Sequence, residues 1–370
     1  MKCLAITAEG LEQLAKQEIK EILNKSSQSK KTAVFFEAEK KELVEFAYKA
    51  RSVKRVLLTI ANISITAEKA RTIQLINAAI KDYDFKTLLN SSSFKVECKR
   101  FGTHQFNSLE IAGEISKIIA EKSNAAISLN APEVIFHSYI YNNDLYFGLD
   151  IAGFNLSKRD YNIFHTQNSL NGAIAYSLVR DTNIKEGETL LNHYANSGAV
   201  SIEAALFFTN KSVNFYKKDK FLAAKLWNID LKQFDRTKAT KTKIICYDRL
   251  MHNITALKKN AQIAGINKEL SIGRVDTEWL DTKIDKKSVD KVIAALPIPS
   301  KIIGEKDIAP VYKEFFYQLD FILRKKHLVV ILIEKDELLK RCMDKFEIIE
   351  ERKVMQGLRE YNVLIMKRKY

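Results

Sequence analysis

A loop that begins at Lys99 combines the residue types that contact nucleic acids. Lys99 and Arg100 supply two cations where a predicted strand ends, and Phe101, His104 and Phe106 follow in the same loop. Cations can bind phosphates here, while aromatic faces can stack on bases or ribose. The alternative is structural: Phe101 and Phe106 would be core residues, and His104 would order the loop through a hydrogen bond.

The overall charge favours a polyanionic partner. The chain has 370 residues with 60 Lys plus Arg against 45 Asp plus Glu, so its formal net charge is +15. Such an excess of cations is typical of proteins that bind nucleic acids. The alternative is an ordinary protein from an organism whose proteins are rich in lysine.

Cysteine usage and hydropathy indicate a reduced, cytoplasmic setting. The four cysteines lie far apart, with no CxxC pair and no histidine at zinc-ligand spacing, so we expect no metal site. The longest aliphatic run, Leu328 to Ile333, is too short to span a membrane and is typical of a buried strand. The first residues lack the profile of a signal peptide. We therefore expect no membrane partner.

Hydrophobic periodicity predicts two small α+β layers in the first part of the chain. The first layer has a strand, a helix, a strand, a helix and a final strand or strand pair: Cys3 to Thr7, Leu11 to Leu23, Val34 to Phe36, Lys41 to Ala50 and Val53 to Ile65. The second has a helix, a strand, a helix and two strands: Glu68 to Ile80, Phe94 to Lys99, Leu109 to Lys122, Val134 to Tyr141 and Asp144 to Leu149. We expect domains at residues 1–65 and 66–155 and a linker at 156–169.

From Leu170 onward, strands alternate with amphipathic helices. This rhythm predicts an α/β domain at residues 170–370 with a doubly wound, largely parallel, Rossmann-like sheet. Two late strands, near Ile348 to Val354 and Tyr361 to Met366, would add an antiparallel edge. A helix is expected at Phe221 to Ile229 within this domain.

The arrangement of the first 165 or so residues resembles a ferredoxin-like domain followed by a THUMP domain, as found in RNA-modifying enzymes. The resemblance is carried by Lys99, Arg100, Gly102, His104, Phe106-Asn107-Ser108 and the later Ser128-Leu129-Asn130-Ala131-Pro132-Glu133. It implies that Lys99, Arg100, Phe101 and His104 bind RNA, with the family's preference for the acceptor end of tRNA. Lys158 and Arg159 match a basic stretch that the same enzymes carry in the linker, so the resemblance adds both to the RNA-binding residues.

The C-terminal part resembles the class I methyltransferase domain of RNA guanine-N2 methyltransferases, whose cofactor is S-adenosylmethionine. The sequence Asn192-His193-Tyr194-Ala195-Asn196-Ser197-Gly198-Ala199 is similar to the family pattern D-P-x-C-G-S-G-T, followed by Ile202-Glu203-Ala204-Ala205. The resemblance places Asn192, Ser197 and Gly198 at the cofactor. Asn192 replaces the acid and Asn196 the first glycine. Asn tolerates the left-handed backbone that glycine supplies, but a neutral Asn192 loses a charge-assisted contact.

Two acids follow later strands at positions where the family binds the cofactor. Asp248 ends the strand Ile244 to Tyr247, at the position that contacts the ribose hydroxyls, and Asp276 stands where an acid faces the adenine amino group. Without the resemblance, either could equally be a strand-end acid that caps the next helix.

The site that methylates exocyclic amines departs most from the family. Enzymes of the family carry the motif N-P-P-Y or D-P-P-Y at this site. The Asn or Asp oxygen and a proline carbonyl accept hydrogen bonds from the target amino group, and the aromatic ring stacks on the flipped base. This chain has Ala295-Leu296-Pro297-Ile298, so Ala295 and Ile298 supply neither the acceptor nor the ring. No catalytic residue can be assigned at this motif.

Two hypotheses follow. The first is a tRNA-binding member of this methyltransferase family with reduced or lost catalysis, assisting a separate catalytic chain. The second is an active S-adenosylmethionine-dependent tRNA guanine-N2 methyltransferase in which Ser300, the Pro297 carbonyl or a partner subunit replaces the missing acceptor. Hydride transfer and nucleotide hydrolysis are disfavoured because the chain has neither G-x-G-x-x-G after a first strand nor G-x-x-x-x-G-K-[ST]. A binding scaffold unrelated to modification would require the C-terminal match to be accidental.

Overall fold

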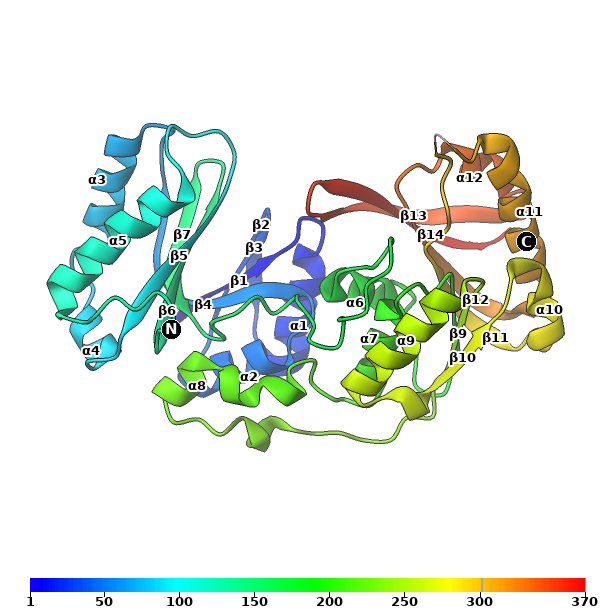
Figure 1. The fold of residues 1–370 in the computed structure, drawn as a ribbon, viewed down its shortest axis with the longest axis horizontal. Coiled ribbons are helices and arrows are strands. Elements are labelled where there is room, and N and C mark those ends of the chain that lie inside the picture. The colour runs from blue at the N-terminus through cyan, green and yellow to red at the C-terminus, as the bar shows by residue number, and fades with distance from the viewer. Residues whose placement is uncertain (301, 370) are drawn as a thin grey trace. The chain divides into compact units, whose positions relative to one another are not determined.

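A computed structural model describes residues 1–300 and 302–369 and divides the chain into two compact units (Figure 1). Unit 1 comprises Met1–Thr7, Glu12–Leu156 and Asn214–Phe234. Unit 2 comprises Ala8–Leu11, Ser157–Val213 and Asp235–Tyr370. The chain thus passes from one unit to the other several times.

Unit 1 is built on one seven-stranded sheet with the order β2-β3-β1-β4-β7-β6-β5. All neighbouring strands are antiparallel except the parallel pair β5 and β6. The strands are β1 (Lys2–Thr7), β2 (Ser27–Lys30), β3 (Ala33–Glu37), β4 (Val53–Ser64), β5 (Phe94–Phe101), β6 (Val134–Tyr141) and β7 (Asp144–Asp150). The two predicted N-terminal domains therefore share one sheet, because β4 of the first pairs with β7 of the second.

The helices of unit 1 pack their apolar sides into one core with alternate residues of the strands. Figure 1 shows α3, α4 and α5 together on one side of strands β5 to β7. The helices are α1 (Glu12–Leu23), α2 (Lys40–Lys49), α3 (Lys69–Ile80), α4 (Phe85–Leu89), α5 (Ser108–Ser123) and α8 (Leu222–Leu226). Ile19, Phe46 and Ile115 are fully buried in this core. Burial of these apolar side chains is the main favourable term for the unit.

Unit 2 contains a second seven-stranded sheet, with the order β10-β9-β8-β11-β12-β14-β13. The first five strands in this order are parallel, and β14 and β13 are antiparallel to their neighbours. The strands are β8 (Thr189–His193), β9 (Lys243–Asp248), β10 (Leu270–Arg274), β11 (Val289–Ala294), β12 (Leu323–Ile333), β13 (Phe346–Gln356) and β14 (Arg359–Arg368). The order reverses between β8 and β11, which is where open α/β sheets bind ligands.

Helices connect the parallel strands of unit 2 and cover its sheet, as predicted. They are α6 (Gly172–Asp181), α7 (Ala199–Phe208), α9 (Met251–Ala264), α10 (Leu280–Lys283), α11 (Glu305–Ile322) and α12 (Glu337–Cys342), with short 3₁₀ turns such as η4 (Thr277–Trp279). One layer of side chains packs α6, α7 and α9 against the sheet, and another packs α11 and α12.

Two features differ from the sequence-based expectation. The segment around Phe221 belongs to unit 1, where Phe221 and Ala223 are buried in the core, and it forms only the short helix α8. β12 begins at Leu323, five residues before the expected Leu328, through an exposed, lysine-rich stretch without an apolar pattern. The late strand pair forms the antiparallel end of the sheet, as predicted, with β14 next to β12 and β13 at the edge.

No helix among the described residues combines the length and the apolar character that crossing a bilayer requires.

Candidate cofactor and nucleic-acid sites

The turn between β8 and α7 has the backbone shape that the motif requires. Asn196 has a φ of 50° and Gly198 a φ of 89°, and α7 begins directly afterwards at Ala199. A Cβ on Gly198 would lie 2.5 Å from Cγ of Leu257, so only glycine fits between the turn and α9. Asn196, which stands where the family pattern has its first glycine, is thus compatible with the turn, because Asn adopts the left-handed conformation.

Asn192 is committed to bonds within the fold. Its Nδ2 donates to the carbonyl of Ile293 at 3.1 Å, and its Oδ1 accepts from the Ser201 hydroxyl at 2.9 Å. The side chain is 1% exposed. A carboxylate in the same place would face the Ile293 carbonyl without a proton to donate, so the neutral amide suits this site better than the acid of the family pattern.

Asp248 is likewise buried and bonded within the fold. Its carboxylate accepts from the Asn196 backbone, the Leu250 backbone and the Asn253 side chain, each at 2.9 Å. Asp248 therefore holds the turn between β8 and α7 against the start of α9, and three of about four acceptor positions on its oxygens are used.

Asp276 differs from Asp248 because its side chain is exposed. Its Oδ1 accepts from the Thr277 backbone at 2.8 Å and begins η4, which leaves acceptor positions directed at solvent. Of the two predicted acids, Asp276 is the one that a bound ligand could reach.

A buried hydrogen-bonded group links the turn after β8 to the loop after β10. His193 Nε2 and the Tyr194 hydroxyl each lie 2.9 Å from the Thr277 hydroxyl oxygen, and the His193 ring stacks on Phe315 with an interplanar angle of 8°. Burial lowers the pKa of His193 to about 3, so the imidazole is neutral. His193 Nδ1 has no hydrogen-bond partner among the described residues. This group was not predicted from the sequence, although His193 in place of the proline of the family pattern was a visible signal.

The structure brings the motif after β11 close to the turn after β8, because β8 and β11 are neighbours. A cavity of about 10 Å³, the size of one water molecule, is lined by residues of both, including Asn192, Tyr194, Asn196 and Ala295. These predicted positions therefore meet at the carboxyl edge of the sheet.

The Ala295 to Ile298 stretch offers little polar chemistry from its side chains. Leu296 is buried, and Ile298 packs against the core layer around α11. The Pro297 carbonyl accepts a hydrogen bond from the Tyr312 hydroxyl at 2.6 Å. The Ser300 hydroxyl oxygen accepts from the backbones of residues 302 and 303, at 3.2 and 3.1 Å. Both groups that could replace the missing acceptor thus already bind neighbours.

The predicted RNA-binding loop of unit 1 is ordered by its own side chains. The Arg100 Nη1 atom donates to the Gly102 carbonyl at 2.8 Å and lies 3.0 Å from His104 Nδ1. Because arginine cannot accept, Nδ1 is the acceptor, and His104 Nε2 carries the proton that it donates to the Asn142 carbonyl at 2.8 Å. His104 also lies over Phe106, with ring centroids 4.9 Å apart.

Only some of the predicted RNA-binding side chains of this loop are exposed. Lys99 and Phe101 are exposed, with the Lys99 ammonium 5.3 Å from the centre of the Phe101 ring. Phe106 is buried in the core and Arg100 is half-buried, as the structural alternative expected for Phe106. Lys99 and Phe101 are the members that a polyanion could reach directly.

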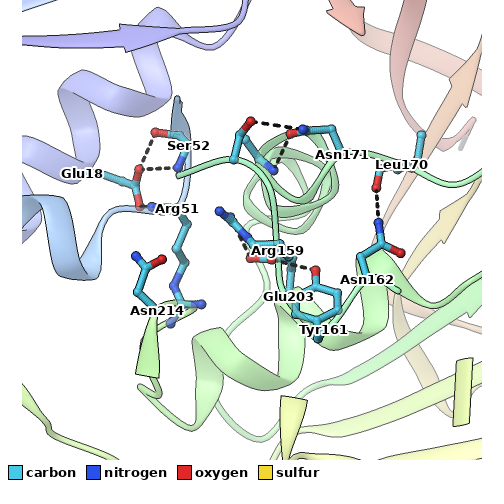
Figure 2. Close-up of polar contacts among 12 residues, drawn as sticks. Glu18, Arg51, Ser52, Arg159, Tyr161, Asn162, Leu170, Asn171, Glu203 and Asn214 are labelled. Atoms are coloured by element: carbon cyan, nitrogen blue, oxygen red, sulfur yellow. Dashed lines mark hydrogen bonds and ion pairs between the residues drawn. The ribbon is translucent and has the colours of Figure 1, made fainter. Parts of the chain in front are cut away.

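Arg159 belongs to a buried ion pair, which corrects its assignment as an RNA contact. Figure 2 shows Arg159 and Tyr161 both directed at Glu203 of α7. Arg159 Nε lies 2.7 Å from Glu203 Oε1, and the Tyr161 hydroxyl donates to the same oxygen at 2.8 Å. Arg159 is 7% exposed, so its guanidinium cannot face RNA, whereas the neighbouring Lys158 is exposed. The sequence does not distinguish these adjacent cations because burial depends on a partner 44 residues away.

The site retains some of the chemistry that S-adenosylmethionine requires. The backbone of the Asn196 to Gly198 turn and the exposed Asp276 carboxylate fit the cofactor, whereas Asn192 and Asp248 are occupied by internal hydrogen bonds. No cluster of His, Cys, Asp or Glu in the described part of the chain could hold a metal ion.

The topology of unit 2, with the motif turn at its reversal point, defines a class I methyltransferase domain. The family model for the RMKL-like methyltransferase domain matches residues 159–363, more than half of the chain, and that for the RlmL ferredoxin-like domain matches residues 2–57. The chain therefore belongs to the RMKL-like methyltransferase family, as the sequence analysis predicted.

Similar proteins extend the match over both units. The tRNA (guanine(6)-N2)-methyltransferase of Methanocaldococcus jannaschii is 26% identical, over 94% of this chain and 95% of that protein. The crystal structure of TrmN from Thermus thermophilus covers 100% of this chain and 99% of its own, with a TM-score of 0.75 and 18% identity. A putative methyltransferase complexed with SAH gives a TM-score of 0.80 at 18% identity, covering 100% and 98% of the two chains. These structures confirm the predicted fold class. The expected loss of catalysis stays a prediction, and these relatives, which are named as methyltransferases, do not support it.

Proposed function

We propose that the chain binds tRNA and methylates the N2 atom of a guanine, with S-adenosylmethionine as the methyl donor. The observation that carries this proposal is the end-to-end similarity to the Methanocaldococcus jannaschii enzyme, which includes the ferredoxin-like part as well as the methyltransferase domain. A shared catalytic fold alone would not carry it, because folds of this kind host many reactions.

The RNA part of the proposal is supported by charge and by the exposed side chains of unit 1. The net charge of +15 favours a polyanion, and Lys99 and Phe101 offer a cation and a ring on the surface. Lys158 is a third exposed candidate, in unit 2. Contacts with phosphates would make the affinity for tRNA fall steeply as salt rises.

The cofactor part is supported by the turn and by Asp276. The backbone from Asn196 to Gly198 would approach the methionine part closely, and the Asp276 carboxylate would accept from the adenine amino group. The bound cofactor would supply an electrophilic methyl group. In this chain, Asp248 and Asn192 would act indirectly, by holding the turn in its bound shape.

A second candidate is a tRNA-binding member that transfers no methyl group and assists a separate catalytic chain. A specific observation favours it: the Ala295 side chain has no acceptor for the guanine amino group, the Ser300 hydroxyl oxygen already accepts two hydrogen bonds, and the Pro297 carbonyl accepts one of the two it can take. A ring able to stack on the base is missing at Ile298 as well.

Calorimetric titration with S-adenosylmethionine tests the cofactor step. We expect binding by the wild type and at least tenfold weaker binding by Asp276→Ala, because one hydrogen bond to a charged group is worth about 1.5 to 3 kcal/mol. Asp281→Ala is the matched control, since this acid is also exposed and lies close in sequence. A wild type that binds no cofactor would exclude the first candidate.

Methyl transfer to bulk tRNA then separates the two candidates. Labelled S-adenosylmethionine, followed by nucleoside analysis, should give N2-methylguanosine if the first candidate holds. Cofactor binding and tRNA binding without any labelled product would favour the second candidate, and the addition of a cell extract would then show whether a partner chain restores transfer.

A further inference from the structure

The loop after β11 leaves the sheet with a single polar restraint. Pro297 and Pro299 fix two φ angles in it and remove two N–H donors, and the buried Leu296 anchors it by packing. The Tyr312 hydroxyl donates to the Pro297 carbonyl at 2.6 Å. Beyond the strand pairing of β11, this is the one hydrogen bond that residues 295–299 make within the described part of the chain. The position of the Pro297 oxygen therefore depends on Tyr312.

The donor of this bond is itself held firmly. Tyr312 lies on the inner side of α11 and is fully buried. Phe315, about one turn later on the same helix, stacks on His193 at the end of β8. Burial raises the pKa of Tyr312 above its ordinary value, so the hydroxyl keeps its proton and can donate. A rigid ring thus places the proton that the Pro297 oxygen accepts.

The Pro297 carbonyl keeps capacity for a second hydrogen bond. A peptide oxygen has two lone pairs, and Tyr312 occupies one of them. The Ala295 side chain has no acceptor, and the Ser300 hydroxyl oxygen already accepts two hydrogen bonds. Of these three candidates in the loop, the Pro297 oxygen is the one that can still accept from an amino group.

We propose that Tyr312 is a positioning residue for methyl transfer: it fixes the Pro297 carbonyl so that the second lone pair accepts a hydrogen bond from the guanine N2 amino group. The inference rests on the proposed function, because it assigns the amine acceptor of that same site. In the transfer, the N2 lone pair forms a bond to the methyl carbon, and the bond from sulfur to this carbon breaks with its electrons left on sulfur. The surplus proton of N2 passes to water.

This arrangement acts on the rate rather than on affinity. N2 gains positive charge as its new bond forms, so its hydrogen bond to the Pro297 oxygen strengthens in the transition state. An interaction that is stronger there than in the bound substrate raises kcat. A displacement of the acceptor by about 1 Å can cost about 100-fold in rate. Loss of the Tyr312 hydroxyl should therefore slow the transfer and leave binding nearly unchanged.

Single-turnover methylation of tRNA by the full chain tests the proposal. Tyr312→Phe keeps the buried ring, and its rate should fall about 10- to 100-fold, while the Kd values for tRNA and S-adenosylmethionine stay within about twofold. Tyr176→Phe is the matched control. Tyr176 is a buried tyrosine on α6 whose hydroxyl accepts from Arg180 at 2.7 Å, so the variant loses the same group elsewhere in unit 2. Its rate should equal that of the wild type.

A second measurement needs no turnover. The chain has four prolines, so labelling proline at the carbonyl with ¹³C gives few NMR signals, and Pro297→Ala identifies the one from Pro297. This signal should shift in Tyr312→Phe. It should also shift in the wild type when tRNA and S-adenosylhomocysteine are added together, because the carbonyl then accepts a second hydrogen bond.

The outcomes separate the inference from the proposed function. Equal single-turnover rates in the wild type and Tyr312→Phe would overturn the inference and leave the function standing. A slower rate with equally weakened tRNA or cofactor binding would do the same, since it would show a general structural role, and so would a Pro297 signal that tRNA does not move. A wild type that transfers no methyl group would overturn both.

Discussion

The two candidate sites differ in whether their side chains face solvent or the interior of the fold. In unit 1, Lys99 and Phe101 are exposed, and the residues behind them, such as Arg100 and His104, order the loop that presents them. In unit 2, Asn192 and Asp248 turn inward, and their bonding capacity is taken up by the protein itself.

A motif can therefore preserve the backbone shape of a site while its side chains take on a structural role. Asp248 holds the turn in place, and Asn192 ties β8 to β11 and α7, so both stabilise the scaffold. Buried polar groups are retained when their hydrogen bonds are satisfied, because leaving a partner unpaired costs about 1 to 3 kcal/mol.

The largest expected effect is the loss of the buried ion pair in unit 2. Arg159→Ala would leave Glu203 buried with the Tyr161 hydroxyl as its remaining donor from this group, and we expect about 3 to 5 kcal/mol of destabilisation. Urea unfolding of the full chain measures it. Lys158→Ala, which changes the adjacent exposed cation, should leave the unfolding midpoint almost unchanged. A loss of tRNA affinity in Arg159→Ala without loss of stability would instead restore the sequence-based assignment.

The second effect is acid destabilisation through two buried histidines, His137 in unit 1 and His193 in unit 2. Burial lowers the pKa of His193, and burial together with Arg55 and Lys99 lowers that of His137, in both cases to about 3. Because the unfolded side chains titrate near pH 6.5, their contribution is complete above that pH and is lost as pH falls. Each should cost roughly 3 kcal/mol of stability by pH 4.5.

His193→Gln is the variant that isolates the unit 2 contribution. In this variant, the slope of the unfolding free energy with pH should fall by the equivalent of one proton taken up on unfolding, between about pH 6 and pH 4.5. His137→Gln should have the same effect through unit 1. An unchanged slope in His193→Gln would show that this imidazole is already protonated in the folded chain.

The smallest effect concerns Thr277, which joins His193 and Tyr194. Thr277→Val removes both hydrogen bonds and should destabilise unit 2 by about 1 to 3 kcal/mol. Hydrogen exchange should also rise together in the turn after β8 and in the loop after β10. Thr277→Ser keeps the hydroxyl and should behave nearly as the wild type, whereas equal exchange in Val and Ser variants would contradict a bridging role.

Much of the fold could be predicted from local patterns. The alternation of strands and helices after Leu170 predicted the parallel sheet with its antiparallel end, and the family match confirms the methyltransferase fold class. The helix expected around Phe221 was harder, because its apolar residues pack into the core of unit 1 and only tertiary contacts reveal that. For the same reason, the sequence could not show that the two N-terminal layers share a sheet.

The candidate sites were predicted as positions rather than as roles. Motif spacing placed Asn192, Gly198, Asp248 and Ala295 near one edge of the sheet, and the structure places them along that edge. It could not show which oxygens remain for a ligand, because that depends on partners such as Ser201 and Asn253.

By itself, the sequence determined the family, the order of the elements and the left-handed turn, since hydrophobic period and Gly or Asn positions act locally. Only the tertiary structure decided that Arg159 pairs with Glu203, that His193 bonds Thr277, and that Tyr312 bonds the Pro297 carbonyl. These contacts join residues far apart in the chain, so burial and hydrogen bonding are settled by packing.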